Sequence, residues 1–123
     1  MGGYKYAFEN LDVWKESREF VSQIYIESKN FPLEEKYGLC SQMQRAAVSI
    51  VSNIAEGISK KSDKEKMRYI EIAYGSLMEV YCQLCIASDL NYLPQVRYDQ
   101  HKAVIDKLAN KLNALSRTLA AKL

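Results

Sequence analysis

Apolar residues recur every three or four positions in four stretches of the chain, which is the period of an α-helix. The stretches cover about residues 11–28, 33–57, 63–90 and 95–121. Short segments rich in Pro, Gly, Ser or Asn separate them, and such segments interrupt helices. Helices of this length joined by short loops pack as antiparallel neighbours. The sequence therefore predicts an all-α fold, an antiparallel up-down-up-down four-helix bundle that forms one domain over residues 1–123.

Local signals predict where these helices begin and end. Asn10 or Asp12 can cap the first helix, because a short side-chain oxygen accepts the free amide protons at a helix N-terminus. Pro32 suits the first turn of the second helix, where its missing N–H has no role. Gly57 is expected to end that helix in a left-handed conformation. The run Ser62-Asp63-Lys64-Glu65 matches a capping box, so the third helix is predicted to start there.

Residues 1–10 precede the first helix and are predicted to form an extended arm. Tyr4, Tyr6 and Phe8 make the arm aromatic, and we expect it to lie across the bundle. The start of the chain lacks the apolar core of a secretory signal. No apolar run reaches the roughly 18 residues of a membrane span. With an odd number of cysteines, three, a reducing compartment is expected, so the prediction is a cytoplasmic protein without membrane contact.

The second predicted helix carries more apolar surface than a single core requires. A helix that faces one core needs an apolar arc of roughly 100°. Val48, Val51 and Ala55 extend the arc well beyond that width. We predict that these three residues contact a partner and form an oligomer interface. The core arc itself contains Leu39, Met43, Ala46, Ala47, Ile50 and Ile54.

Two polar strips lie on the second and third predicted helices at helical spacing. Antiparallel packing of these helices can join the strips in a buried hydrogen-bonded network that fixes the register or an interface, because buried polar groups need partners. The alternative is that both strips face solvent. The strips consist of Ser49, Asn53 and Glu56 on the second helix and of Ser76, Glu79 and Gln83 on the third.

Charge is unevenly distributed, although the net charge is only +2. Residues 58–68 contain five basic and two acidic side chains, residues 95–123 contain six and two, and residues 69–94 contain no Lys or Arg. Such segregation predicts basic surfaces at one loop and along the last helix, although ordinary solvated faces explain it equally well. The candidate nucleic-acid-binding residues are Arg45, Lys60, Lys61, Lys64, Lys66 and Arg68, followed by Lys107, Lys111 and Arg117.

Catalytic and metal-binding patterns are weak. Cys82 and Cys85 form a Cys-x-x-Cys pair, but zinc needs four ligands and a redox pair belongs at a helix N-terminus, so small core residues are predicted. The single histidine excludes the paired Glu-x-x-His motifs of di-iron bundles. His101 follows Arg97 by four positions, which faintly resembles the Arg/His pair of small helical ribonucleases of the HEPN type. His101 lies on an apolar stripe, however, and a structural histidine is favoured. We predict no catalytic residue, metal or cofactor.

Several segments together resemble the four-helix bundle proteins encoded in intervening sequences of bacterial 23S ribosomal RNA genes. The segments are residues 8–14, Phe31-Pro32 with Glu35, residues 37–39, residues 42–57 and residues 72–79. The resemblance implies a homopentamer around a central opening. Similar accessory proteins of diversity-generating retroelements bind nucleic acid and a reverse transcriptase through a basic surface. The family often has two basic residues where this chain has Gln44-Arg45, which weakens the case for nucleic-acid binding by that helix.

The sequence thus favours a non-enzymatic, oligomeric bundle that binds RNA or other nucleic acid. Binding is expected to be directed at the backbone and tolerant of sequence, because most aromatic residues belong to the predicted core. An adaptor role for a nucleic-acid-processing protein is part of this hypothesis. The first alternative is a protein–protein scaffold whose basic residues only confer solubility. The second is a small helical nuclease that depends on Arg97 and His101.

Overall fold

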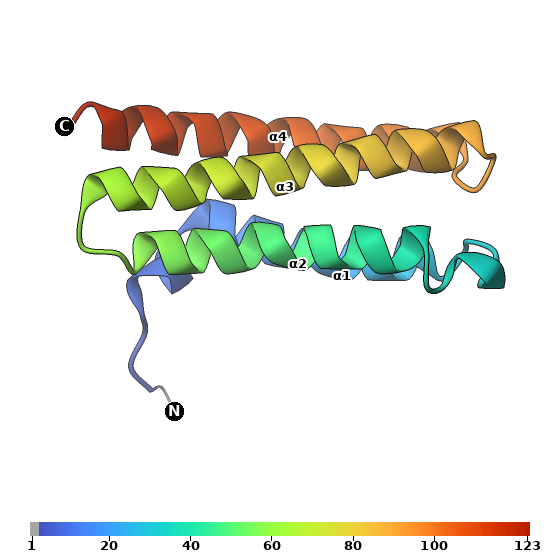
Figure 1. Ribbon diagram of the computed structural model, residues 1–123, viewed down its shortest axis with the longest axis horizontal. Coiled ribbons are helices and arrows are strands. Elements are labelled where there is room, and N and C mark those ends of the chain that lie inside the picture. Colours follow the sequence, from blue (N-terminus) through green and yellow to red (C-terminus); the bar gives the residue numbers. More distant parts are fainter. Residues whose placement is uncertain (1–2) are drawn as a thin grey trace.

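Four α-helices make up most of the computed structural model, which describes residues 3–123. Figure 1 shows them side by side along the long axis, with the chain direction reversing from each helix to the next. The all-α prediction and the number of helices are confirmed, and residues 3–123 contain no strand. The elements are η1 (Ala7–Asn10), α1 (Asp12–Ser28), η2 (Leu33–Glu35), α2 (Leu39–Ile58), α3 (Asp63–Asp89) and α4 (Gln95–Ala120), where η marks a short 3-10 helix.

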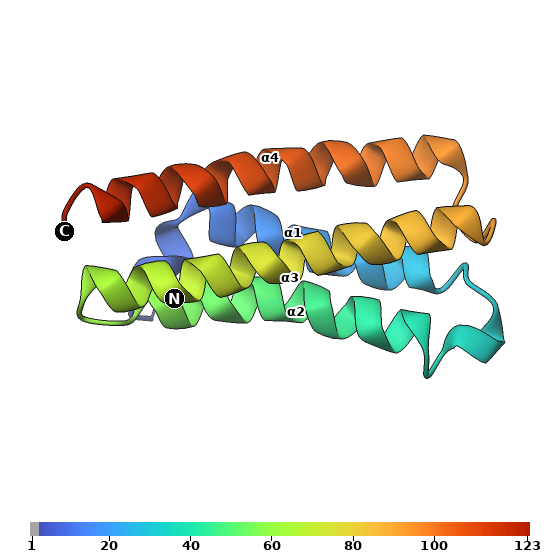
Figure 2. The same ribbon diagram turned by 45° about the horizontal axis from the view of Figure 1, so that its top comes forward.

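All four helices contribute to one continuous core. Figure 2 shows α1 behind α2 and α3, with α4 running along the opposite side. Phe20, Met43, Leu77 and Leu108, one from each helix, are completely buried. Complete burial of a large apolar side chain contributes roughly 1.5–3 kcal/mol relative to exposure. The predicted core arc of α2 is buried as expected, apart from the half-buried Leu39.

The second helix begins later than predicted. Pro32 precedes the separate 3-10 turn η2, and α2 starts only at Leu39. Gly38 lies between them with φ −108° and ψ −109°, which are not helical angles. The Glu35 carboxylate accepts a hydrogen bond of 3.3 Å from the amide of Leu39 and so satisfies one free donor at the new helix start.

The predicted caps have mixed outcomes. Neither Asn10 nor Asp12 caps α1, because Leu11 occupies the N-cap position and provides no side-chain bond. The start of α3 is confirmed, since the Ser62 hydroxyl accepts a hydrogen bond of 3.1 Å from the amide of Glu65. Side-chain capping is thus used where α3 follows an exposed loop.

Gly57 does not act as a left-handed cap. It is helical, and α2 continues to Ile58 before Ser59 ends it in a right-handed conformation. A Cβ atom placed on Gly57 would lie 2.7 Å from Cβ of Tyr69, so the glycine permits the close approach of α2 and α3. Asn91, with φ 62°, supplies the left-handed residue after α3.

The N-terminal arm does not lie across the bundle as predicted. Figure 1 shows it projecting away from the helices, near the end of α2. Tyr4 is 83% exposed and Tyr6 is 61% exposed. Only the last part of the segment packs, where the ring centroid of Phe8 lies 5.0 Å from that of Trp14.

The prediction that Cys82 and Cys85 are core residues is wrong for Cys82, which is exposed, while Cys85 is half-buried. Cys82 lies two residues from both Val80 and Leu84, which are buried. Two residues turn a helix by roughly 200°, so Cys82 must point away from the core that these neighbours face.

Candidate nucleic-acid interface and a buried ion cluster

Most of the predicted basic residues meet at one end of the bundle, where α2 ends and α3 begins. Figure 1 shows that α4 ends there too, and its last turn carries Arg117. The lysines of the loop and of the first turn of α3 extend into solvent or lie half-buried. We call this surface the basic end. Its members are Lys60, Lys61, Lys64, Lys66, Arg68 and Arg117.

Lys60 lies at the basic end, whereas Arg45 lies far from it. The Lys60 ammonium lies 4.9 Å from the ring centroid of Tyr69, a cation–π contact that holds it beside the α2–α3 junction. Arg45 is exposed but belongs to the second turn of α2. The rise of 1.5 Å per residue separates it from the helix end by about 20 Å. The structure therefore does not bring Arg45 to the basic end.

Two predicted basic residues of α4 already have an anionic partner. The Lys107 Nζ atom lies 3.0 Å from Oε1 of Glu16 on α1, and Lys111 donates to the other oxygen of the same carboxylate. The hydrogen bond from Lys111 is the main reason that the pKa of Glu16 falls below its ordinary value. Glu16 therefore offsets one of the two charges, which makes this pair a weaker phosphate site than the basic end.

The two polar strips meet in part across α2 and α3. The Ser49 and Ser76 hydroxyl oxygens lie 2.8 Å apart. The Asn53 amide donates to the Ser49 carbonyl at 2.8 Å and to its hydroxyl at 3.0 Å. Glu56 and Glu79 are exposed, and the structure does not bring them into this cross-helix bond. The strips thus give one link between helices. Gln83 is buried, and its amide donates to the Glu79 carboxylate at 3.4 Å.

The outer faces of α2 and α3 carry exposed apolar side chains and one exposed glycine. Val48, Ile72 and Ile86 are exposed, whereas Val51 and Ala55 are half-buried against the bundle. Gly75 is exposed on the same side of α3 as Ile72 and Ile86, and a Cβ atom on it would meet nothing within 4 Å. A bare helix surface lets another backbone approach closely. We call Val48, Ile72, Gly75 and Ile86 the outer patch.

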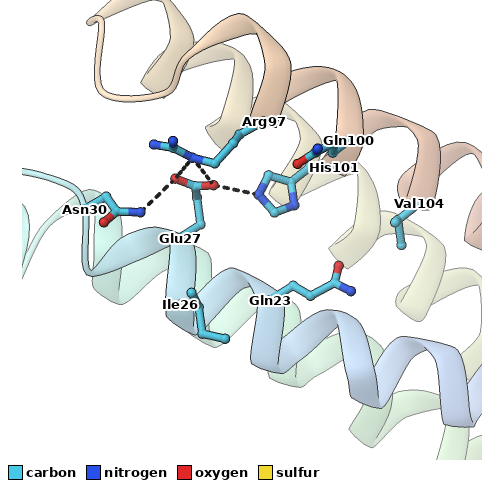
Figure 3. Close-up of a pocket in the computed structure, with 8 residues that line it drawn as sticks. All are labelled: Gln23, Ile26, Glu27, Asn30, Arg97, Gln100, His101 and Val104. Carbon is cyan, nitrogen blue, oxygen red and sulfur yellow. Dashed lines mark hydrogen bonds and ion pairs between the residues drawn. The ribbon is translucent and has the colours of Figure 1, made fainter.

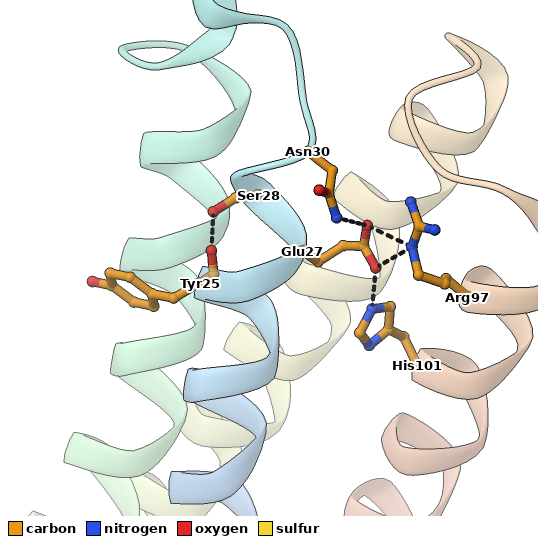
Figure 4. Close-up of polar contacts among 6 residues, drawn as sticks. All are labelled: Tyr25, Glu27, Ser28, Asn30, Arg97 and His101. Atoms are coloured by element: carbon orange, nitrogen blue, oxygen red, sulfur yellow. Dashed lines mark hydrogen bonds and ion pairs between the residues drawn. The ribbon is translucent and has the colours of Figure 1, made fainter.

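A buried ion cluster joins the end of α1 to the start of α4 (Figure 4). Glu27 is only 3% exposed. The Arg97 Nε atom donates to both of its carboxylate oxygens at 3.0 Å, and the His101 Nε2 atom lies 2.9 Å from Oε1. The Asn30 amide adds a longer contact of 3.4 Å. His101 is therefore a partnered structural residue within this part of the fold.

The cluster favours the ionised form of Glu27 and determines which ring nitrogen of His101 faces it. Burial alone would raise the pKa of Glu27, but the hydrogen bonds from His101, Arg97 and Asn30 outweigh burial and lower it. An ionised carboxylate only accepts hydrogen bonds, so Nε2 of His101 carries a proton. In the neutral ring Nδ1 is then a free acceptor, and Figure 3 shows this second nitrogen on the side away from Glu27.

A pocket of about 330 Å³ opens beside the ion cluster. Three side-chain amides and two apolar side chains line it with the cluster, as Figure 3 shows. Glu27 was not among the residues predicted from the sequence. It follows Phe20 by seven positions and Ile24 by three, so it shares their buried stripe. An acidic residue on one apolar stripe and a histidine on another are the signal that would have paired them.

Neither a membrane span nor a metal cluster emerges from residues 3–123. None of their helices combines the length and the apolar character that crossing a bilayer demands. These residues also contain no group of three or more His, Cys, Asp or Glu side chains placed to hold a metal ion. The half-buried Cys85 thiol instead lies 3.7 Å from the Tyr98 hydroxyl.

These features define a class of protein, a four-helix bundle with a basic end and an exposed outer patch. The chain belongs to the family described as 23S rRNA-intervening sequence protein, whose profile matches residues 9–114. This confirms the resemblance inferred from the sequence.

A solved structure and a search of curated proteins complete the comparison. The bundle is similar to a protein of unknown function from the S23 ribosomal protein family of Bacteroides thetaiotaomicron VPI-5482, with a TM-score of 0.78 and 22% identity. The match covers 85% of this chain and 97% of that chain, and at this identity it shows the fold alone. No curated protein matches the sequence.

Proposed function

We propose that the protein is a non-enzymatic, cytoplasmic RNA-binding bundle that binds phosphate backbones through its basic end. The observation that carries this proposal is the concentration of basic side chains where α2, α3 and α4 meet. Within residues 3–123, no carboxylate lies within ion-pair distance of Lys60, Lys61, Lys64 or Lys66. Unpaired cations at one place attract polyanions and release their counterions on binding.

We further propose that several up-down-up-down bundles assemble, as a homopentamer, through the outer patch. The net charge of one chain is small, so a single basic end binds phosphate weakly. A ring of copies repeats the same cations around a common axis and increases the field that a nucleic acid meets. The exposed apolar residues and Gly75 on the outer faces of α2 and α3 support such contacts. The assembly can then present RNA to a nucleic-acid-processing protein.

Charge reversal with a matched control tests the RNA proposal. Lys60→Glu, Lys61→Glu and Lys64→Glu together should weaken RNA binding at least tenfold in fluorescence anisotropy at low salt. Each lost phosphate contact should also reduce the slope of log affinity against log salt by about 0.7–0.9. Lys29→Glu with Lys36→Glu, at the opposite end, is the control and should change both quantities little. Equal losses in both variants, or binding without salt dependence, would contradict the proposal and favour a protein–protein scaffold.

One observation favours a second candidate function, a metal-independent nuclease. Glu27 orients His101 so that Nδ1 is a free acceptor, and the terminal nitrogens of Arg97 remain available for a phosphate. At such a site His101 would take the proton of the RNA 2′-hydroxyl, whose oxygen bonds to the adjacent phosphorus; the bond to the 5′-oxygen breaks, leaving a 2′,3′-cyclic phosphate, and the expelled 5′-oxygen takes a proton from water. Incubation of the protein with RNA in EDTA tests it, since a nuclease would cleave RNA but not DNA, and His101→Gln would stop cleavage. Intact RNA after incubation rules this candidate out.

A further inference from the structure

The arm before η1 carries aromatic rings that are exposed and do not pack into the core. Tyr4 and Tyr6 are 83% and 61% exposed, with Lys5 between them. Figure 1 shows the arm leaving the bundle near the end of α2. Single exposed apolar side chains are ordinary, but exposed apolar side chains that lie next to one another mark interaction sites. We call residues 4–8 the aromatic arm.

The rings of the aromatic arm form a continuous ladder that leads back to α1. The centroids of Tyr4 and Tyr6 lie 5.1 Å apart in an edge contact, and those of Tyr6 and Phe8 lie 6.3 Å apart with an interplanar angle of 7°. Phe8 contacts Trp14, and the Arg18 guanidinium lies 5.4 Å from the Trp14 centroid. The ladder is anchored at its α1 end, while its tip at Tyr4 remains open. Its rings are therefore arranged before any ligand arrives.

The arm also lies close to the basic end. The arm runs into η1, which packs against α2 and against α1, and α2 leads directly into the loop with Lys60 and Lys61. Lys5 on the arm and Arg18 at the base of the ladder add positive charge beside the rings. Interleaved cations and open aromatic faces complement a polyanion with unpaired bases better than a second copy of a chain that is itself positive.

We propose that Tyr4 and Tyr6 stack on unpaired bases of single-stranded RNA whose phosphates bind the basic end. The ligand class is single-stranded, because bases inside a duplex do not offer their faces to a side chain. Every base has an aromatic face, so recognition tolerates many sequences. This inference rests on the proposed function and narrows it, since a purely backbone-directed protein would bind duplex and single strands through the same cations.

A double variant tests the arm on the full chain. Tyr4→Ala with Tyr6→Ala should weaken binding of a single-stranded 12-nucleotide RNA at least tenfold, because loss of one stacked base commonly costs about five- to 150-fold in affinity. Affinity for a 12-base-pair RNA duplex should stay within about twofold. Tyr4→Phe with Tyr6→Phe should retain single-strand affinity, because the rings remain. Tyr37→Ala is the control, since Tyr37 is 87% exposed at the opposite end, beside Lys36.

Each outcome separates the arm from the basic end. Unchanged single-strand affinity in the double alanine variant, with salt-dependent binding intact, overturns the arm proposal and leaves the proposed function standing. A wild-type protein that binds neither RNA overturns the proposed function and the arm proposal with it. A lower solution mass of the double alanine variant, with RNA affinity per chain unchanged, assigns the arm to a contact between copies and also overturns the proposal.

Discussion

Two glycines show how differently a single position can act within helices of this bundle. Gly57 faces α3, where an added Cβ atom would lie 2.7 Å from Cβ of Tyr69 and 3.3 Å from the Lys66 carbonyl oxygen. Gly75 faces open space. Gly57 is required by the packing of α2 against α3. Gly75 destabilises its helix as glycine usually does, and no contact within the chain requires a glycine there.

Alanine at these two glycines should therefore have opposite effects. Gly57→Ala should lower the free energy of unfolding by about 1–3 kcal/mol, because the clash exceeds the gain in helix propensity. Gly75→Ala should raise it by about 0.5–1 kcal/mol in the monomer. Urea denaturation at a concentration where light scattering shows single chains measures both. Destabilisation by Gly75→Ala under those conditions would show a packing role that the structure lacks.

The buried Glu27 carboxylate predicts a pH dependence of stability. Its pKa in the folded protein lies below the ordinary 4.5. A lowered pKa means that the carboxylate contributes its full stability above the unfolded value, and that this contribution is lost as the pH falls through the folded pKa. Glu27→Gln should cost about 3 kcal/mol at pH 7, because Arg97 loses its buried partner.

Urea denaturation of wild type and Glu27→Gln at pH 7 and at pH 3.5 measures this linkage. The difference between the two proteins should shrink at the lower pH, which lies below the ordinary pKa of 4.5, because the carboxyl group then binds a proton in the unfolded wild-type chain more readily than in the folded one. Asp99→Asn on the exposed surface of α4 is a control that should shift stability little at either pH. A constant difference between wild type and Glu27→Gln would mean that packing, and not charge, accounts for the role of Glu27.

At the scale of elements, the helix interiors were predictable and their connections were not. Stripes such as Met43, Ile50 and Ile54 repeat with the helical period, and burial of that stripe determines the helix. The start of α2 escaped prediction because the non-helical angles of Gly38 interrupt an otherwise suitable stretch. The position of the N-terminal arm was not predicted correctly, because its aromatic residues show that the segment is apolar but not which part of the bundle it contacts.

In the candidate site, too, local features were predictable from the sequence and contacts between distant elements were not. The charge pattern predicted a basic surface at the α2–α3 loop, and the structure places those residues together. Pairing between distant elements was not readable, so sequence reasoning overlooked Glu27 and did not foresee that Glu16 engages Lys107 and Lys111. Such pairs depend on the packing of α1 beside α4, which residue spacing within one helix does not encode.

The contact of Glu16 with α4 predicts a separation between stability and binding. Lys107→Ala with Lys111→Ala should lower the free energy of unfolding by about 0.5–1 kcal/mol, because two partly exposed ion pairs are lost. RNA affinity should fall less than in the triple variant of the basic end. Thermal denaturation and anisotropy on the same samples measure both. A larger loss of RNA affinity than in the triple variant would move the interface from the loop to α4.

At the scale of the whole molecule, the proposed assembly of several chains depends on contacts through the outer patch. An exposed valine in the middle of α2 adds little to the stability of one chain, but a charge placed there opposes its burial between chains. Val48→Glu should therefore reduce the solution mass towards that of a single chain while the helical circular dichroism stays unchanged. Val96→Glu is a matched control, because Val96 is an exposed apolar residue of α4 outside the patch.

Light scattering coupled to size exclusion distinguishes the possible results, and RNA binding on the same fractions links them to function. A wild-type mass near five chains that falls only in Val48→Glu supports a ring built on the outer patch. If the ring also concentrates positive charge, the dissociated Val48→Glu chains should bind RNA more weakly and with a smaller salt slope, although every basic residue is retained. A monomeric wild-type protein would contradict assembly through the patch. Equal RNA binding by ring and monomer would show that one basic end is sufficient.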